Sequence, residues 1–286
     1  MPEGHTTHAL AGRLNGAFAA SAVAVSSPQG KFADGAALLD GLRLVDASAW
    51  GKHLFAEFEG ERWLNVHLGL IGKFSVMAHP GGHIPVEGQV RLRLLNDSWV
   101  GDLRGPTVCA VVTPQKVDQI RARLGPDPLR QDADPDLALY RISRSARSIA
   151  ELLMDQAVLA GVGNVYRCEV LFRHRVDPFR PGRQILPATW RAIWDDLVSL
   201  MPLGVAFGQI VTMDDQVADA MAAVADGSAA ATTAAVTGAR LGNRFERRFY
   251  LYRRTGEPCR VCGRTVRTQL LAGRNLFWCG RCQRRR

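Results

Sequence analysis

The first residues of the chain place a secondary amine beside a carboxylic acid. The sequence opens MPEGHTTHALAGRL, so removal of Met1 exposes the backbone nitrogen of Pro2, and Glu3 follows it. A terminal α-amine has a pKa of about 7.7–8.0, against about 10.4 for lysine, and a sizeable fraction is therefore an unprotonated nucleophile at neutral pH. Pro2 and Glu3 are candidates for Schiff-base catalysis. The alternative is that Pro2 only begins a helix, where proline is well tolerated.

The end of the chain contains a candidate metal site. Two Cys-x-x-Cys pairs have the spacing of a closed tetrahedral zinc site, with no open position for chemistry, and predict one structural Zn²⁺. The ligands are Cys259, Cys262, Cys279 and Cys282. Between the pairs, TVRTQLL and NLFWC flank the turn AGR and predict a hairpin. Arg274 at its tip suits bidentate contact with a phosphate, although it could equally be a solvated surface residue.

Three further residues are candidates for contact with a polyanion. Asn164 follows the glycine turn AGVG and is predicted to cap the next helix, whose N–H groups attract a phosphate. A plain helical hairpin is the alternative there. Lys52 precedes a strand in WGKHL and could be an ordinary exposed surface residue. Leu70, flanked by glycines in HLGLIG, could be a wedge between base pairs or an ordinary packed residue.

The composition favours a basic globular protein. Its 286 residues are enough for two domains and a small third module, and 47% hydrophobic with 22% charged residues is typical of a folded chain. No apolar run is long enough to cross a bilayer and no signal pattern begins the chain, so we expect a cytoplasmic protein without a membrane partner. The formal charge of +9 favours a polyanionic partner. A reducing compartment favours metal over disulfides for the clustered cysteines.

Three differently built parts of the chain must position these residues. After an opening helix, roughly the first 120 residues are short strands and turns, including a hairpin about Glu59 and Gly60, which predicts a sandwich-like β layer. The middle is predicted to be helical on both sides of AGVGN, with another helix in IWDDLVSLMPLGVAFGQIV. The Pro- and Asp-rich stretch RLGPDPLRQDADPDL marks a linker.

Taken in order, these motifs resemble the formamidopyrimidine-DNA glycosylase and endonuclease VIII family of DNA repair enzymes. The segments that carry the resemblance are MPEG, GKHL, HLGLIG, LGPDPL, LMDQAVLAGVGNVYRCEVLF and AGRNLFWCGRC, which together span nearly the whole chain. Each is weak or moderate alone, but the ordered set is highly specific. The opening is most similar to the endonuclease VIII branch, of an actinobacterial type.

The resemblance implies an α+β fold in three parts. These are an N-terminal β-sandwich-like catalytic domain with an opening helix over 2–122, a helical domain with a helix-two-turn-helix motif over 136–248, and a C-terminal zinc-finger β-hairpin over 249–286. Residues 123–135 would link the first two. The Ala-rich insertion 214–246 in the helical domain is compatible with a mobile lid or with disorder.

The resemblance also implies the activity, that of a bifunctional DNA glycosylase and AP lyase of base excision repair, acting on oxidised bases and chiefly on pyrimidines. Pro2 would attack C1′ of a nucleotide extruded from the duplex, and the resulting iminium would permit β- and δ-elimination, with Glu3 as general acid/base. Lys52 and Arg274 complete the catalytic set by gripping phosphates together with Asn164, and Leu70 fills the vacated gap. The expected partner is damaged DNA, double-stranded or single-stranded, bound by a monomer.

Several departures from the family pattern leave substrate choice open. Thr6 stands where many relatives have Glu, Gly105 and Pro106 replace the Arg–Phe pair of the guanine-oxidation branch, and Ala150 replaces a lysine. Two alternatives therefore remain beside the proposed activity. One is a catalytically silent protein that binds damaged DNA, and the other is a glycosylase directed to 8-oxoguanine and formamidopyrimidines.

Overall fold

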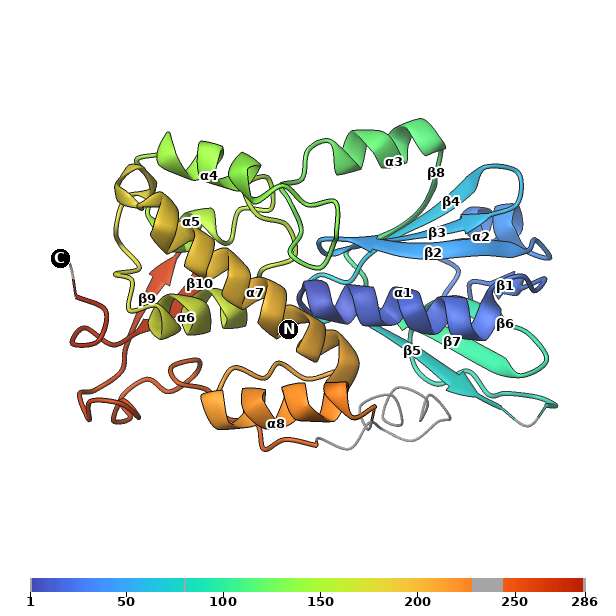
Figure 1. Ribbon diagram of the computed structural model, residues 1–286. Coiled ribbons are helices and arrows are strands. Elements are labelled where there is room, and N and C mark those ends of the chain that lie inside the picture. Colours follow the sequence, from blue (N-terminus) through green and yellow to red (C-terminus); the bar gives the residue numbers. More distant parts are fainter. Residues whose placement is uncertain (1, 80, 228–243, 285–286) are drawn as a thin grey trace. The chain divides into compact units, whose positions relative to one another are not determined.

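The computed structural model describes residues 2–79, 81–227 and 244–284. The chain divides into two compact units, the first within residues 2–123 and the second formed by 124–227 and 244–284 (Figure 1). Among the described residues, no helix has the length and apolar character needed to span a membrane.

The first unit contains two four-stranded antiparallel sheets. One has the strand order β2-β3-β4-β8 and the other β1-β6-β7-β5. The strands are β1 (Ala24–Ser26), β2 (Leu44–Trp50), β3 (His53–Phe58), β4 (Arg62–His67), β5 (Lys73–Ala78), β6 (Val90–Leu95), β7 (Trp99–Arg104) and β8 (Val108–Val112). The expected hairpin about Glu59 and Gly60 is formed by β3 and β4.

The opening helix α1 (Gly4–Phe18) is fixed to this unit by an apolar stripe and by one side chain. Leu10, Leu14 and Phe18 recur every four residues and are buried in the core, as an amphipathic helix requires. The Asn15 amide donates to the Ala47 carbonyl at 2.9 Å and accepts from the Ala47 N–H at 2.6 Å, so α1 is joined to β2. Two short helices, α2 (Ala33–Leu39) and α3 (Pro114–Arg121), complete the unit.

The second unit is helical and ends in a hairpin. Its helices are α4 (Pro135–Ser143), α5 (Ile149–Leu152), α6 (Asn164–Arg173), the 3₁₀ turn η1 (Gly182–Gln184), α7 (Pro187–Phe207) and α8 (Asp214–Ala225), followed by β9 (Arg267–Leu271) and β10 (Arg274–Trp278). These elements share one core, in which Trp190 and Tyr166 are fully buried. The expected α+β class, with a sandwich-like first part, a helical second part and a terminal hairpin, is confirmed.

The turn between α5 and α6 is held by a single glutamine. The Gln156 side-chain amide donates to the carbonyls of Met154 and Val162 and accepts from the N–H of Gly161, which has φ +87°. Helix α6 begins at Asn164, with Gly163 as its N-cap residue. Asn164 is therefore the first helical residue and not the predicted cap, and its side chain does not cap the helix.

The Ala-rich segment is partly helical. Residues 214–225 form α8, whose Val217, Ala220 and Ala223 are buried against the rest of the second unit. Its first turn is anchored by Asp214, which accepts hydrogen bonds from Arg173 and from the Tyr250 hydroxyl. Residues 228–243 of the segment lie outside the described residues.

Candidate active site and nucleic-acid interface

The amine and the acid lie at the beginning of α1. Pro2 is half-buried, and Glu3, the N-cap residue of α1, is fully buried. The Glu3 carbonyl accepts the Thr6 N–H at 2.9 Å, so the helix begins directly behind the pair. A carboxyl group buried here is shielded from bulk water, as suits a group that exchanges protons with a bound substrate.

The residues behind the pair are neutral. His5 is buried, and burial lowers the pKa of its imidazole to about 3, with the positive charge of the N-terminus and then His8 contributing. The ring is therefore uncharged at pH 7. The Thr6 hydroxyl lies 3.2 Å from His5 Nε2. Neither residue adds charge beside Glu3 at pH 7.

Lys52 lies at the same end of the first unit as Pro2 and Glu3. It occupies the two-residue turn between β2 and β3, where Trp50 pairs with His53. Helix α1 runs antiparallel to β2, because Ala19 bridges to Leu44 while Asn15 bonds to Ala47. At a helical rise of about 1.5 Å per residue, the start of α1 lies about 16 Å from the Asn15–Ala47 contact. At a strand rise of about 3.3 Å per residue, the end of β2 at Trp50, just before Lys52, lies about 10 Å from that contact in the same direction.

Two histidines connect Lys52 to the glycine loop that follows β4. His53 and His67 are paired residues of β3 and β4, and their ring centroids are 5.0 Å apart. Burial, His53 and the charge of Lys52 lower the pKa of His67 to about 4. The neutral His67 Nδ1 accepts the Gly69 N–H at 3.2 Å. Residue types alone suggested no role for these histidines, although the register of the Glu59–Gly60 hairpin already places them opposite each other.

The glycine loop presents two apolar side chains rather than one. Leu70 is 50% exposed and Ile71 is 86% exposed. Gly69 has φ +68°, and a Cβ there would lie 1.9 Å from the Thr107 hydroxyl, so only glycine fits. The interpretation of Leu70 as exposed agrees with this loop, whereas sequence reasoning missed Ile71. Gly105 lies next to Ile71.

In the second unit, Asn164 and Arg274 are brought together by a hydrogen bond between their elements. Asn164 is only 5% exposed, and its Nδ2 donates to the backbone carbonyl of Asn275 at 2.9 Å. Its Oδ1 accepts from Arg167. Arg274 is half-buried and begins β10, directly after a turn in which Ala272 and Gly273 have φ of +48° and +72°. Positive φ at both positions is typical of a tight type I′ hairpin turn. Arg274 is therefore the first residue after a rigid turn.

The four cysteines form the expected cluster. Their Sγ atoms all lie within 4.8 Å of one another, with Cys259–Cys282 at 3.9 Å and Cys262–Cys279 at 3.4 Å. A tetrahedral ion with Zn–S bonds of about 2.3 Å requires Sγ atoms about 3.8 Å apart, so the residues fit zinc. The sulfur-only donor set also favours zinc over harder ions. These cysteines hold the ends of the β9–β10 hairpin together, and the metal is structural.

A buried carboxylate fixes the segment that leads to the zinc site. Glu169 of α6 is fully buried and accepts the N–H groups of Tyr250, Leu251 and Tyr252 at 2.7, 2.9 and 3.0 Å, and the Thr212 hydroxyl at 3.0 Å. Burial raises the pKa of its carboxyl group, while these four hydrogen bonds act in the opposite direction. Sequence reasoning missed this residue because three of its four partners lie some 80 positions away and the fourth lies 43 positions away.

Three family models match most of the chain. The formamidopyrimidine-DNA glycosylase N-terminal domain matches residues 1–109, the formamidopyrimidine-DNA glycosylase H2TH domain matches 124–216, and a zinc finger found in FPG and IleRS matches 256–285. The chain therefore belongs to the formamidopyrimidine-DNA glycosylase and endonuclease VIII family, whose members are DNA glycosylases with AP lyase activity in base excision repair.

Individual relatives agree with this assignment. Endonuclease 8 1 of Mycobacterium tuberculosis is 50% identical over 285 residues, covering 99% of this chain and 100% of the relative. Formamidopyrimidine-DNA glycosylase of Thermus thermophilus is 30% identical over 86% of this chain and 85% of its own. The crystal structure of MutM (Fpg) from T. thermophilus has a TM-score of 0.73 at 27% identity, over 99% of this chain and 98% of that chain. Lactococcus lactis Fpg, solved with abasic-site DNA, shares the fold with a TM-score of 0.76 at 18% identity, over 99% of this chain and 100% of that chain.

Proposed function

We propose that this protein removes oxidised bases from DNA, preferring pyrimidines, through a Schiff base on Pro2, and then cleaves the abasic strand by β,δ-elimination. The observation that carries the proposal is the half-exposed Pro2 directly before the fully buried Glu3 at the start of α1. The nitrogen would bond to C1′ of the deoxyribose as the bond from C1′ to the base breaks. Because proline is a secondary amine, the product is a charged iminium without a separate protonation step.

The later steps use the same two residues. Glu3 protonates the ring oxygen as the sugar opens. The iminium makes the C2′ proton acidic, and loss of that proton expels the 3′ phosphate. A second elimination then expels the 5′ phosphate, and water releases the sugar remnant from Pro2. The role of the rest of the site is to hold the everted nucleotide against this nitrogen.

We assign the grip on the flanking phosphates to Lys52, Asn164 and Arg274. Lys52 comes from the turn at the same end of the first unit as Pro2, which supports its assignment. Asn164 acts by fixing the hairpin that carries Arg274, because both ends of its amide are engaged in internal hydrogen bonds. Leu70, with Ile71 beside it, would fill the gap left by the everted nucleotide.

The preference for pyrimidines rests on the relatives and on one departure. The mycobacterial relative at 50% identity is named as an endonuclease 8, and Gly105 and Pro106 replace the Arg–Phe pair of the guanine-directed branch. We further propose that the protein acts in the cytoplasm as a monomer on damaged duplex DNA. We also propose the domain limits 2–122, 136–248 and 249–286.

Borohydride trapping on an abasic-site duplex tests this proposal. The protein with Met1 removed should form a covalent adduct with the strand, whereas one carrying an additional residue before Pro2 should form none. A tag of the same length at the C-terminus is the matched control. Side-by-side cleavage of thymine-glycol and 8-oxoguanine duplexes then tests the preference. Tight binding to abasic DNA with no adduct and no cut strand would instead favour a protein that binds damaged DNA without catalysing its cleavage.

A further inference from the structure

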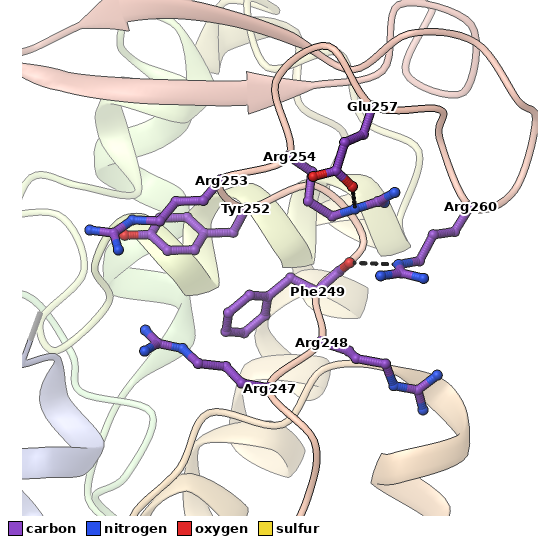
Figure 2. Close-up of a pocket in the computed structure, with 8 residues that line it drawn as sticks. All are labelled: Arg247, Arg248, Phe249, Tyr252, Arg253, Arg254, Glu257 and Arg260. Atoms are coloured by element: carbon purple, nitrogen blue, oxygen red, sulfur yellow. Dashed lines mark hydrogen bonds and ion pairs between the residues drawn. The ribbon is translucent and has the colours of Figure 1, made fainter.

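A hollow of about 380 Å³ lies in the second unit, on the segment that leads into the zinc site (Figure 2). Five of its eight lining residues are arginines, and only one, Glu257, is acidic. Two aromatic side chains, Phe249 and Tyr252, line it beside the arginines, which include Arg247, Arg253 and Arg260.

Two of the five arginines are neutralised within the protein. Arg254 pairs with Glu257 at 2.8 Å and also donates to the carbonyls of Tyr250 and Pro258. Arg248 pairs with Asp215 and Glu246. These two side chains hold the segment together, and their charges are already balanced.

The other three guanidinium groups have no acidic partner among the described residues. Arg247, Arg253 and Arg260 are all exposed at the rim of the hollow. Arg260 donates its Nε hydrogen to the Phe249 carbonyl at 3.1 Å, which orients the group and leaves its two Nη groups for a ligand. Arg247 and Arg253 lie on one side of the hollow and Arg260 lies on the other (Figure 2). An anion in the hollow would be attracted by all three positive charges, which no acidic side chain among the described residues balances.

Arg253 is held by the backbone in an unusual conformation. Its φ is +59°, in the left-handed region where a residue with a Cβ is disfavoured relative to glycine. Its guanidinium lies over the Tyr252 ring, 5.5 Å from the ring centroid, as Figure 2 shows. The stacking holds this guanidinium at one edge of the hollow, and a disfavoured backbone conformation of this kind is often retained at ligand sites.

We propose that this hollow binds a backbone phosphate of DNA, as a site additional to the grip of Asn164 and Arg274. This inference rests on the proposed function for the identity of the ligand. Phe249 and Tyr252 are 8% and 6% exposed, too little to stack on a base, so the ligand is a phosphate rather than a nucleobase. The Tyr252 ring packs edge-on against Phe277 of β10, at 5.5 Å between centroids, two residues along that strand from the Asn275 carbonyl that binds Asn164. The segment that forms the hollow therefore packs against the hairpin that carries Arg274.

The test uses Arg253→Gly, which removes the guanidinium and relieves the backbone. Affinity for a duplex with an uncleavable abasic-site analogue should fall roughly tenfold at low salt, the effect of one lost charge-assisted hydrogen bond. The slope of log affinity against log salt should become shallower by about 0.9, the value for one phosphate contact. The melting temperature should stay the same or rise. Arg175→Gly is the matched control, because Arg175 is also exposed with φ +53° but lies outside the hollow.

The outcomes separate this inference from the proposed function. If the unaltered protein binds the duplex and Arg253→Gly matches it in affinity and salt slope, the assignment is overturned. The assignment is overturned in that case even if calorimetry shows that inorganic pyrophosphate, used as a probe, binds in the hollow. The natural ligand would then be a free anion and not DNA. Equal losses in Arg253→Gly and Arg175→Gly would also overturn it, since a general charge effect then suffices. Failure of the unaltered protein to bind damaged DNA instead refutes the proposed function.

Discussion

Asn164 joins the first turn of α6 to the hairpin that carries Arg274, through a 2.9 Å hydrogen bond from its side-chain amide to the backbone carbonyl of Asn275. The two elements are more than 100 residues apart in the chain, and both are proposed to face DNA. Because the bond is buried, its energy is not greatly reduced by competition from water. It makes the position of Arg274 depend on Asn164.

Asn164→Ala removes the hydrogen bond to the Asn275 carbonyl and the one from Arg167. It should therefore weaken binding of an abasic-site duplex by about 1–2 kcal/mol, because the unpaired Asn275 carbonyl no longer holds the hairpin in place. Binding can be measured by fluorescence anisotropy. Asn275→Ala is the control, because it leaves the backbone carbonyl in place and should bind DNA almost normally. Normal affinity in Asn164→Ala would mean that the hairpin is positioned by other contacts.

Glu3→Gln should separate the two activities of the enzyme. Removal of the proton donor should slow base release by about 10²–10⁴-fold, the usual contribution of general acid catalysis. Cleavage at a pre-formed abasic site should fall less, because its sugar already opens to an aldehyde without protonation by the enzyme. Single-turnover rates on the two substrates give the comparison. Equal losses on both would show that Glu3 acts mainly after the Schiff base forms.

Much of this site follows from local sequence, and the remainder follows from contacts that no local pattern encodes. The Pro2–Glu3 pair, the zinc cysteines and the hairpin tip at Arg274 each lie within a few residues and are visible as motifs. The exposure of Ile71 depends on how the loop leaves β4. The role of Glu169 depends on N–H groups of residues 250–252, and the strain at Arg253 depends on tertiary structure. Asn164 was correctly placed at the start of α6, but its side chain does not cap that helix. The amide instead donates a hydrogen bond to the hairpin, at the Asn275 carbonyl.

Removal of the metal should disorder the hairpin without unfolding the first unit. Cys279→Ser should lose zinc, because three thiolates cannot close the tetrahedral shell, and binding of the abasic-site duplex should fall with it. Metal content can be measured by atomic absorption. Cys109→Ser, at a half-buried cysteine outside the cluster, should keep its zinc. A Cys279→Ser protein with full zinc and normal DNA binding would contradict the assigned ligand set.

Acid should destabilise the protein in a window set by His5. The folded pKa is about 3, below the ordinary value of 6.5, so between these values the unfolded chain binds a proton that the folded chain excludes. The free energy of unfolding should therefore fall as pH drops below about 6.5, by up to about 1.4 kcal/mol per pH unit for this one group. Urea unfolding from pH 7.5 to 5 measures the slope. His5→Gln should show a flatter dependence on pH, and an unchanged slope would assign the effect to other groups.

Glu169→Gln should destabilise the second unit, because an amide in this place has one acceptor atom and presents its NH₂ group to backbone N–H donors. The carboxylate accepts four hydrogen bonds, and leaving two or more buried donors unpaired should lower the free energy of unfolding by about 3 kcal/mol. Thr212→Val removes only one of the four and should cost about 1 kcal/mol. Urea unfolding gives both values, and the difference between the variants is the decisive quantity. Equal, small losses would mean that water replaces the missing acceptor and that the carboxylate does not hold residues 250–252 in place.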